Sequence, residues 1–156
     1  PTYDAPAAAI RAAVRAALEE SPVRSALMSI AIVDDEAIRL LNRQHLEHDY
    51  ATDVLSFSLE SSPDYLEGEI VVSADTAQRE AVLAGWSTDD ELVLYVVHGM
   101  LHLLGYEDKR PADAMQMRAA EAALLARLGI ACSATDSRWL SESLPARSDA
   151  GGPSPL

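Results

Sequence analysis

The feature that most constrains this chain is an apolar run over residues 92–104 that contains two histidines. The run reads Leu-Val-Leu-Tyr-Val-Val-His-Gly-Met-Leu-His-Leu-Leu, which is typical of a mostly buried helix. His98 and His102 are four residues apart, so their side chains lie on one face of that helix, one turn apart. Two imidazoles in this arrangement can bind one metal ion such as zinc. The alternative is a pair of core histidines whose nitrogens bond backbone carbonyls.

The segment after the run supplies a helix end and two carboxylates. Gly105 is expected to end the helix, because glycine adopts the left-handed conformation of a C-terminal cap without a Cβ clash. The chain then turns and can bring Glu107 or Asp108 back toward the histidines as an oxygen ligand. Two imidazoles and one carboxylate, with a fourth position left to water, form the pattern of a catalytic zinc site rather than a closed structural one.

Length and composition limit the class of protein. The 156 residues, of which 49% are hydrophobic, indicate one globular domain with a real core. The single cysteine, Cys132, excludes an internal disulfide and a zinc site built from paired thiolates, and it fits a reducing compartment. No stretch reaches the roughly 18 apolar residues of a membrane span, and no secretory signal pattern is visible. We therefore expect a cytoplasmic protein without a membrane partner.

The charge balance argues against strong non-specific binding to nucleic acid. Twelve basic residues face 25 acidic ones, which leaves a formal net charge of −13. Proteins that bind nucleic acid through its phosphates usually present a basic face. Any contact with RNA would therefore depend on a local group of arginines within an acidic surface.

Hydrophobic periodicity predicts alternating helices and strands. Helices are expected over residues 5–20, from 34–36 to about 45, from 73–75 to 83, from 88 to 104, and from Pro111 to Gly129. Strands are expected over residues 26–33, 54–59 and 68–73, with a turn or loop over 61–65. We expect one domain over residues 1–131, followed by a flexible tail over 132–156 that is rich in Ser, Pro, Gly and Ala.

Four motifs together resemble the YbeY family of bacterial metal-dependent endoribonucleases. They are Leu41-Asn42, Asp49-Tyr-Ala-Thr52-Asp53-Val54-Leu55-Ser56-Phe57, Gly68-Glu69-Ile70-Val71-Val72-Ser73 and His98-Gly-Met-Leu-His102-Leu-Leu-Gly105-Tyr106. They follow the family's order and spacing and cover about residues 27–129. The resemblance implies an α+β fold in which a small mixed sheet packs with helices and a zincin-like metal site lies on a buried central helix. It also implies one zinc ion per chain and cleavage of single-stranded RNA.

Two positions depart from the family pattern. The family's third histidine ligand corresponds to Asp108 here, and zinc accepts an aspartate oxygen at a similar distance. Asp108 is therefore the expected third metal ligand beside His98 and His102, with Glu107 as the alternative. The family's cleft arginine corresponds to Leu46, which cannot clamp a phosphate as a guanidinium does. Arg43, three residues earlier on a neighbouring part of the same helix face, could replace that arginine. Alternatively, Arg43 is an ordinary solvent-exposed residue with no role in the site.

The remaining motif residues have less specific interpretations. Thr52 and Asp53 favour a turn before a strand, and Asp53 can alternatively orient a ligand histidine. Glu69 is either a charge on an edge strand or a group that faces the metal cleft. A zinc protease with such a helix carries a glutamate general base directly after the first histidine, where this chain has Gly99. Gly99 argues against a peptidase, although Glu107 or Glu69 could supply a base from elsewhere.

The resemblance thus predicts a zinc-dependent, single-strand-specific endoribonuclease in rRNA maturation and quality control of the small ribosomal subunit. Its expected catalytic residues are His98, His102 and Arg43, and its expected partners are single-stranded rRNA, the small subunit and its assembly factors, but not DNA. One alternative is a non-catalytic or weakly active ribosome-assembly factor, which Leu46 and Asp108 favour. Another is a metal-dependent hydrolase with a non-RNA substrate, which the acidic surface would suit.

Overall fold

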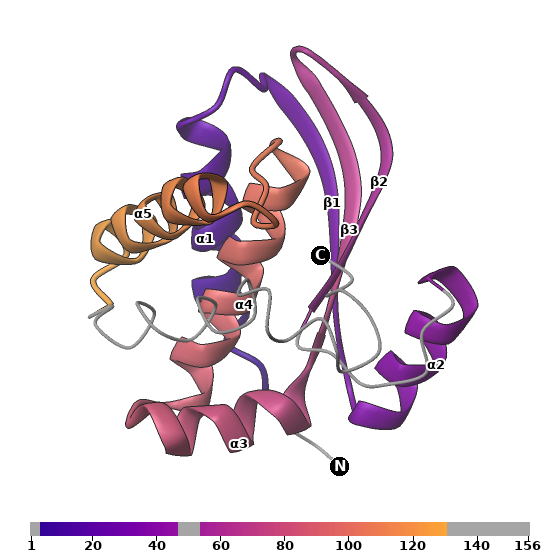
Figure 1. Ribbon diagram of the computed structural model, residues 1–156, viewed down its shortest axis with the longest axis vertical. Helices are drawn as coiled ribbons and strands as arrows, with labels where there is room; N and C mark the ends of the chain where they lie inside the picture. The colour runs from indigo at the N-terminus through magenta and orange to yellow at the C-terminus, as the bar shows by residue number, and fades with distance from the viewer. Residues whose placement is uncertain (1–3, 47–53, 131–156) are drawn as a thin grey trace.

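The computed structural model describes residues 4–46 and 54–130, and within them it has the expected α+β fold with a small mixed sheet. The elements in chain order are α1 (Ala7–Glu19), β1 (Ser25–Val33), α2 (Asp35–Leu46), β2 (Val54–Ser62), β3 (Tyr65–Ser73), α3 (Ala74–Ala84), α4 (Thr88–Leu103) and α5 (Pro111–Arg127). Helix α4, which carries both histidines, lies between the sheet and helices α1 and α5, and α3 crosses its N-terminal end (Figure 1). The predicted buried central helix is therefore confirmed.

The sheet has the strand order β1-β3-β2, with β3 parallel to β1 and antiparallel to β2. Strands β2 and β3 form a hairpin in which only Pro63 and Asp64 connect the paired ends. The loop expected over residues 61–65 is therefore shorter than predicted. The C-terminal half of β2 is solvent-exposed and pairs with β3 through its backbone. It therefore lacks the alternation of apolar and polar residues by which a half-buried strand is recognised in a sequence.

The two faces of the sheet are covered by different helices. Ile70 and Val72 point into the core that α1, α4 and α5 share, whereas Val71 packs with Leu55 and with Ile38 of α2 on the other face. Successive side chains of a strand point to opposite faces, so β3 joins the two cores. Figure 1 shows α2 on the side of the sheet opposite α4.

Helix α4 approaches the sheet closely at Gly99. A Cβ atom at this position would lie 3.0 Å from Ser56 Oγ and 3.1 Å from the Ile70 side chain. The Ser56 hydroxyl also donates a hydrogen bond to the Gly99 carbonyl, with 3.3 Å between the oxygens. Gly99 is therefore a packing residue, and its lack of a side chain determines how deeply the histidine helix is set against β2 and β3.

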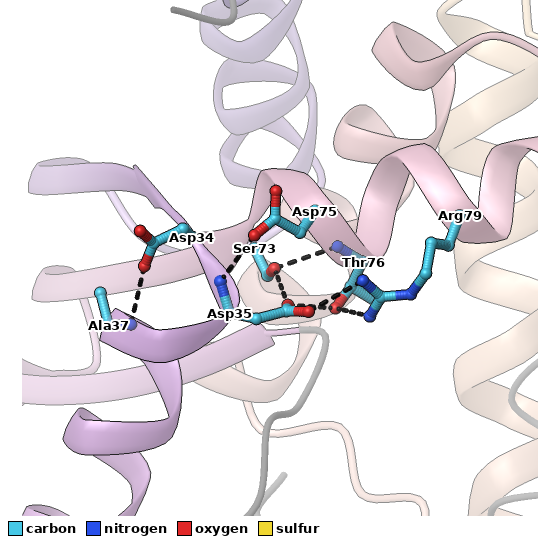
Figure 2. Close-up of polar contacts among 7 residues, drawn as sticks. All are labelled: Asp34, Asp35, Ala37, Ser73, Asp75, Thr76 and Arg79. Carbon is cyan, nitrogen blue, oxygen red and sulfur yellow. Dashed lines mark hydrogen bonds and ion pairs between the residues drawn. The ribbon is translucent and has the colours of Figure 1, made fainter. Parts of the chain in front are cut away.

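A polar network joins the N-terminal ends of α2 and α3 at the carboxyl ends of two parallel strands (Figure 2). Asp35 Oδ1 accepts hydrogen bonds from the hydroxyls of Ser73 and Thr76, and Asp35 Oδ2 lies 2.8 Å from Arg79 Nη1. In return, Asp75 accepts a hydrogen bond from the Asp35 backbone N–H at 3.0 Å. Each helix thus supplies a carboxylate to the start of the other, where unpaired N–H groups favour negative charge.

None of the helices in the described segments is long and apolar enough to cross a membrane. The tail predicted over residues 132–156, with Cys132, lies outside the described residues. The domain boundary at residue 131 therefore stays a prediction.

Candidate metal centre

Helix α4 holds the two histidines in a buried setting. The helix begins after Ser87, whose hydroxyl caps it by accepting a hydrogen bond from the Asp90 N–H at 3.0 Å. Every residue from Glu91 to Leu101 is buried. The side chains of His98 and His102 are 3% and 11% exposed, and their ring centroids are 4.7 Å apart. The expected shared helix face is therefore present, and it is almost closed to solvent.

The turn after α4 brings the third side chain to this face. Gly105 has a φ of 106°, as predicted for the residue that ends the helix. Its N–H bonds the His102 carbonyl at 3.1 Å, and the Tyr106 N–H reaches back to the Leu101 carbonyl at 2.9 Å. This pair of bonds is a Schellman motif, which reverses the chain direction. The reversal places Asp108 beside the two imidazoles.

The three side chains can hold a metal ion. Asp108 Oδ2 lies 3.5 Å from His102 Nε2 and 3.9 Å from His98 Nε2. One ligand atom from each of the three residues lies within 4.8 Å of the other two. Imidazole nitrogens and a carboxylate oxygen that lie this close together can serve as ligands of one cation.

Two electrostatic features favour a cation at this point. His102 Nε2 is buried and has no hydrogen-bond partner among the described residues, which is a costly state for a polar atom unless a ligand satisfies it. Burial is the largest influence on the pKa of Asp108 and raises it, but the adjacent His102 and His98 outweigh burial and lower the pKa below its usual value. Asp108 is therefore a carboxylate near neutral pH, at the helix end that carries partial negative charge.

Glu121 is a site residue that the sequence interpretation missed. It lies on α5, is 1% exposed, and its Oε2 atom contacts His98 Nδ1 as a hydrogen-bond partner. The buried face of α5 consists of Ala114, Met117, Glu121, Leu124 and Leu125. A single acidic residue at a core position of an amphipathic helix was the available signal, because buried carboxylates are rarely tolerated without a partner.

Two other carboxylates that were considered lie elsewhere. Glu107 is exposed and lines an open hollow with Tyr106, Asp113 and Gln116. Glu69 lies on β3, the central strand, so the suggestion of an edge-strand charge is wrong. Its side chain shares a face with Val71, which packs toward α2, so it points away from the α4 face of the sheet.

The candidates near the end of α2 are less well placed. Arg43 is exposed on α2, across the sheet from α4 (Figure 1). Leu46 is the last residue of α2, and its side chain lies outside the described part of the chain, as do Thr52 and Asp53. The roles suggested for these four residues stay predictions.

Comparisons with known proteins agree with this architecture. The family model described as Endoribonuclease YbeY matches residues 3–129. A relative of that name from Rhodopirellula baltica is 43% identical over 122 residues, which cover 77% of this chain and 62% of the relative. The corresponding protein of Syntrophotalea carbinolica is 41% identical over 118 residues, or 71% of this chain and 79% of the relative. In a third relative, from Myxococcus xanthus, the match covers only 41% of the length.

A solved structure supports the fold. The solution structure of TM1509 from Thermotoga maritima superposes with a TM-score of 0.55 at 23% sequence identity, covering 80% of this chain and 87% of that one. The chain spans less than two thirds of the Rhodopirellula and Myxococcus relatives, so their sequences contain residues with no counterpart in this match.

Proposed function

Since this chain belongs to the endoribonuclease YbeY family, we propose that it is a zinc-dependent endoribonuclease that cleaves single-stranded RNA during rRNA maturation. In this proposal it acts in the cytoplasm on RNA of the small ribosomal subunit and contributes to the quality control of that subunit. One zinc ion per chain would be held by His98, His102 and Asp108, which would leave room for a water or a substrate oxygen.

The observation that carries the proposal is the buried group of two imidazoles and one carboxylate at the end of α4. Imidazole and carboxylate are ligands that suit zinc, and three protein ligands leave room for a water or substrate oxygen. A closed structural site would have a fourth protein ligand. Among the described residues, the group that can hold a metal has three members.

The chemistry divides between the ion and the protein. A zinc ion held there would supply a water of lowered pKa and would polarise a phosphoryl oxygen, so the protein would need no nucleophilic side chain. His98 and His102 present their nitrogens from one rigid helix, and Asp108 adds a negative charge that strengthens cation binding. We keep Arg43 as the candidate contact for a substrate phosphate, a role that rests on its sequence spacing alone.

A non-catalytic ribosome-assembly factor is the second candidate. Asp108 reduces the net positive charge at a bound ion, which makes the water less acidic than three neutral histidines would. Leu46 removes the guanidinium that would stabilise charge on the phosphate, and removal of one such donor costs roughly 10²- to 10³-fold in other enzymes. This candidate predicts a metal-loaded protein that does not cleave RNA.

Metal content and RNA cleavage, measured on the same preparation, test the proposal. We expect about one zinc per chain, cleavage of a single-stranded RNA but not of its duplex, and loss of cleavage with a chelator. The double variant His98→Ala/His102→Ala should lose the metal and the activity while its circular dichroism keeps the helical signal. Met115→Ala, at an exposed position of α5, is the control and should behave as wild type.

Each result has a distinct meaning. Unchanged metal content in the double histidine variant would show that the ion is bound elsewhere. A zinc-loaded wild-type protein that leaves single-stranded RNA intact would support the assembly factor or the hydrolase with a non-RNA substrate.

A further inference from the structure

The contact between α4 and α5 gives Glu121 a specific relation to the metal centre. Its Oε2 atom is the hydrogen-bond partner of His98 Nδ1, and both side chains are almost fully buried. The other ring nitrogen, His98 Nε2, faces Asp108 at 3.9 Å. The imidazole of His98 therefore lies between a carboxylate on α5 and the group that can hold a metal.

This arrangement determines which nitrogen carries the proton. A neutral imidazole has one N–H donor and one nitrogen lone pair, and a carboxylate partner accepts a hydrogen bond. The proton of neutral His98 is thus held on Nδ1, which leaves the lone pair on Nε2. We propose that Glu121 is a positioning residue that keeps His98 in this tautomer and ring orientation, with Nε2 directed at the metal.

The inference deepens the proposed metal site and rests on it. Carboxylates that orient a metal-bound histidine raise its basicity, and their loss typically lowers metal affinity by about 10- to 100-fold. Among the residues that the structure describes, Glu121 has this relation to His98 and not to His102. The nitrogens and the oxygen that would contact the ion come from His98, His102 and Asp108, and Glu121 acts through the first of them.

Packing alone does not account for a glutamate here. Its Oε1 atom is buried and has no hydrogen-bond partner among the described residues. The rest of the buried face of α5 is apolar, so burial there does not itself require a carboxylate, and the contact with His98 compensates for burying one. Replacing Glu121 alone removes the buried acceptor of His98 and destabilises the fold in either role, so the tautomer of His98 and the zinc affinity are the measurements that separate a positioning role from a structural one.

The tautomer of His98 is the first measurement, made by ¹⁵N NMR of the imidazole nitrogens in the metal-free protein, with the pH raised until the spectrum shows one protonated and one unprotonated ring nitrogen. The wild-type protein should show the proton of His98 on Nδ1. The Glu121→Leu variant should lose that preference, whereas Glu121→Gln, whose amide oxygen still accepts a hydrogen bond, should keep it. A proton on Nε2 in the wild type, or no change in Glu121→Leu, would overturn the inference.

Zinc affinity, measured by competition with a chromophoric chelator, is the second measurement. We expect Glu121→Leu to bind zinc about 10- to 100-fold more weakly than wild type and Glu121→Gln to fall between them. Met117→Leu changes a buried residue one turn earlier on the same face and should bind zinc as wild type does. In urea, the metal-free Glu121→Leu protein should unfold at a lower concentration than wild type, because the buried imidazole of His98 loses its acceptor, so zinc affinity is compared under conditions where both proteins are folded.

The two measurements separate this inference from the proposed function. A wild-type protein with the Nδ1–H tautomer that binds no zinc would contradict the proposed function but not the positioning of His98. Normal zinc binding in Glu121→Leu would contradict the inference alone. If Glu121→Leu does not fold, Glu121→Gln decides the question, and wild-type zinc affinity in that variant together with an altered His98 tautomer would overturn the inference.

Discussion

Asp108 and Glu107 are adjacent carboxylates in different surroundings. Asp108 is mostly buried beside the two histidines, whereas Glu107 is exposed in the neighbouring hollow. Loss of a residue that merely orients a metal ligand typically lowers metal affinity by about 10- to 100-fold. Asp108 is an expected ligand itself, so we expect Asp108→Ala to weaken zinc binding by at least that factor. Asp108→His should bind zinc more tightly than wild type, because imidazole nitrogen is a strong zinc ligand.

Glu107→Ala is the matched control and should leave zinc affinity unchanged in the same chelator competition. A neutral Asp108→Ala together with a damaging Glu107→Ala would instead identify Glu107 as the ligand. The turn that starts at Gly105 would then adopt a different conformation when the metal is bound.

Gly99 tests how tightly the histidine helix packs on the sheet. Alanine is favoured over glycine in a helix by about 1 kcal/mol, but a Cβ atom here would lie 3.1 Å from fully buried Ile70. Overpacking of a core typically costs about 1–3 kcal/mol, so we expect Gly99→Ala to lower the free energy of unfolding by roughly 1–2 kcal/mol in urea.

The partner variant Ile70→Val removes one of the crowding carbons and supplies the check on Gly99→Ala. In the double variant, part of the cost should disappear, and a double-mutant cycle measures this coupling. Additive effects of the two substitutions would show that residues 99 and 70 are not energetically coupled, and would contradict the tight packing of α4 on the sheet.

At the scale of elements, the network around Asp35 determines how α2 and α3 are held together (Figure 2). Burial is the largest influence on the pKa of Asp35 and raises it, but hydrogen bonds from Ser73, Thr76 and Arg79, together with the Arg79 charge, outweigh burial and lower it. The unfolded-state pKa is about 3.9, so the folded state favours the charged form. This stabilisation is complete above that value and is lost as pH falls through the lower folded-state pKa.

We therefore expect Asp35→Asn to reduce the free energy of unfolding by roughly 1–2 kcal/mol at neutral pH, allowing for the partial exposure of the group. The difference from wild type should shrink when urea unfolding is repeated near pH 3, where the unfolded carboxyl is protonated. Asp34→Asn is the control, because Asp34 caps α2 through the Ala37 N–H and asparagine caps equally well. If the loss of stability in Asp35→Asn were the same at both pH values, it would arise from packing rather than from the charge of Asp35.

At the scale of the whole molecule, the formal net charge of −13 opposes binding to a polyanion. The affinity of a protein for single-stranded RNA falls with salt by a logarithmic slope of about −0.7 for each phosphate it neutralises. We expect weak binding with a slope no steeper than about −2, measured by fluorescence anisotropy between about 50 and 200 mM salt. A slope of about −5 would instead show that basic residues are concentrated on one surface. Duplex DNA of equal length should bind more weakly than the single-stranded RNA.

The sequence alone was sufficient for features that depend on short-range geometry. Residues four apart lie on one face of any helix, so the shared face of His98 and His102 does not depend on where the helix packs. Gly105 ends the helix because glycine adopts a positive φ readily, which is also a local property. The same local rules predicted Pro111 at the start of α5 and most of the strand positions. The three side chains that lie close enough to hold a metal come from eleven consecutive residues, so the sequence could propose such a group, although its spacing left Asp108 and Glu107 as alternatives.

Only the tertiary structure decided which distant groups meet. Glu121 lies 23 residues after His98, and their contact depends on the packing of α5 against α4. The side of the sheet that Glu69 faces and the length of the β2–β3 hairpin depend on strand order and register. Periodicity identifies the buried face of an element but not its neighbour, because many partners can bury the same apolar surface, and the packing of the whole chain selects among them.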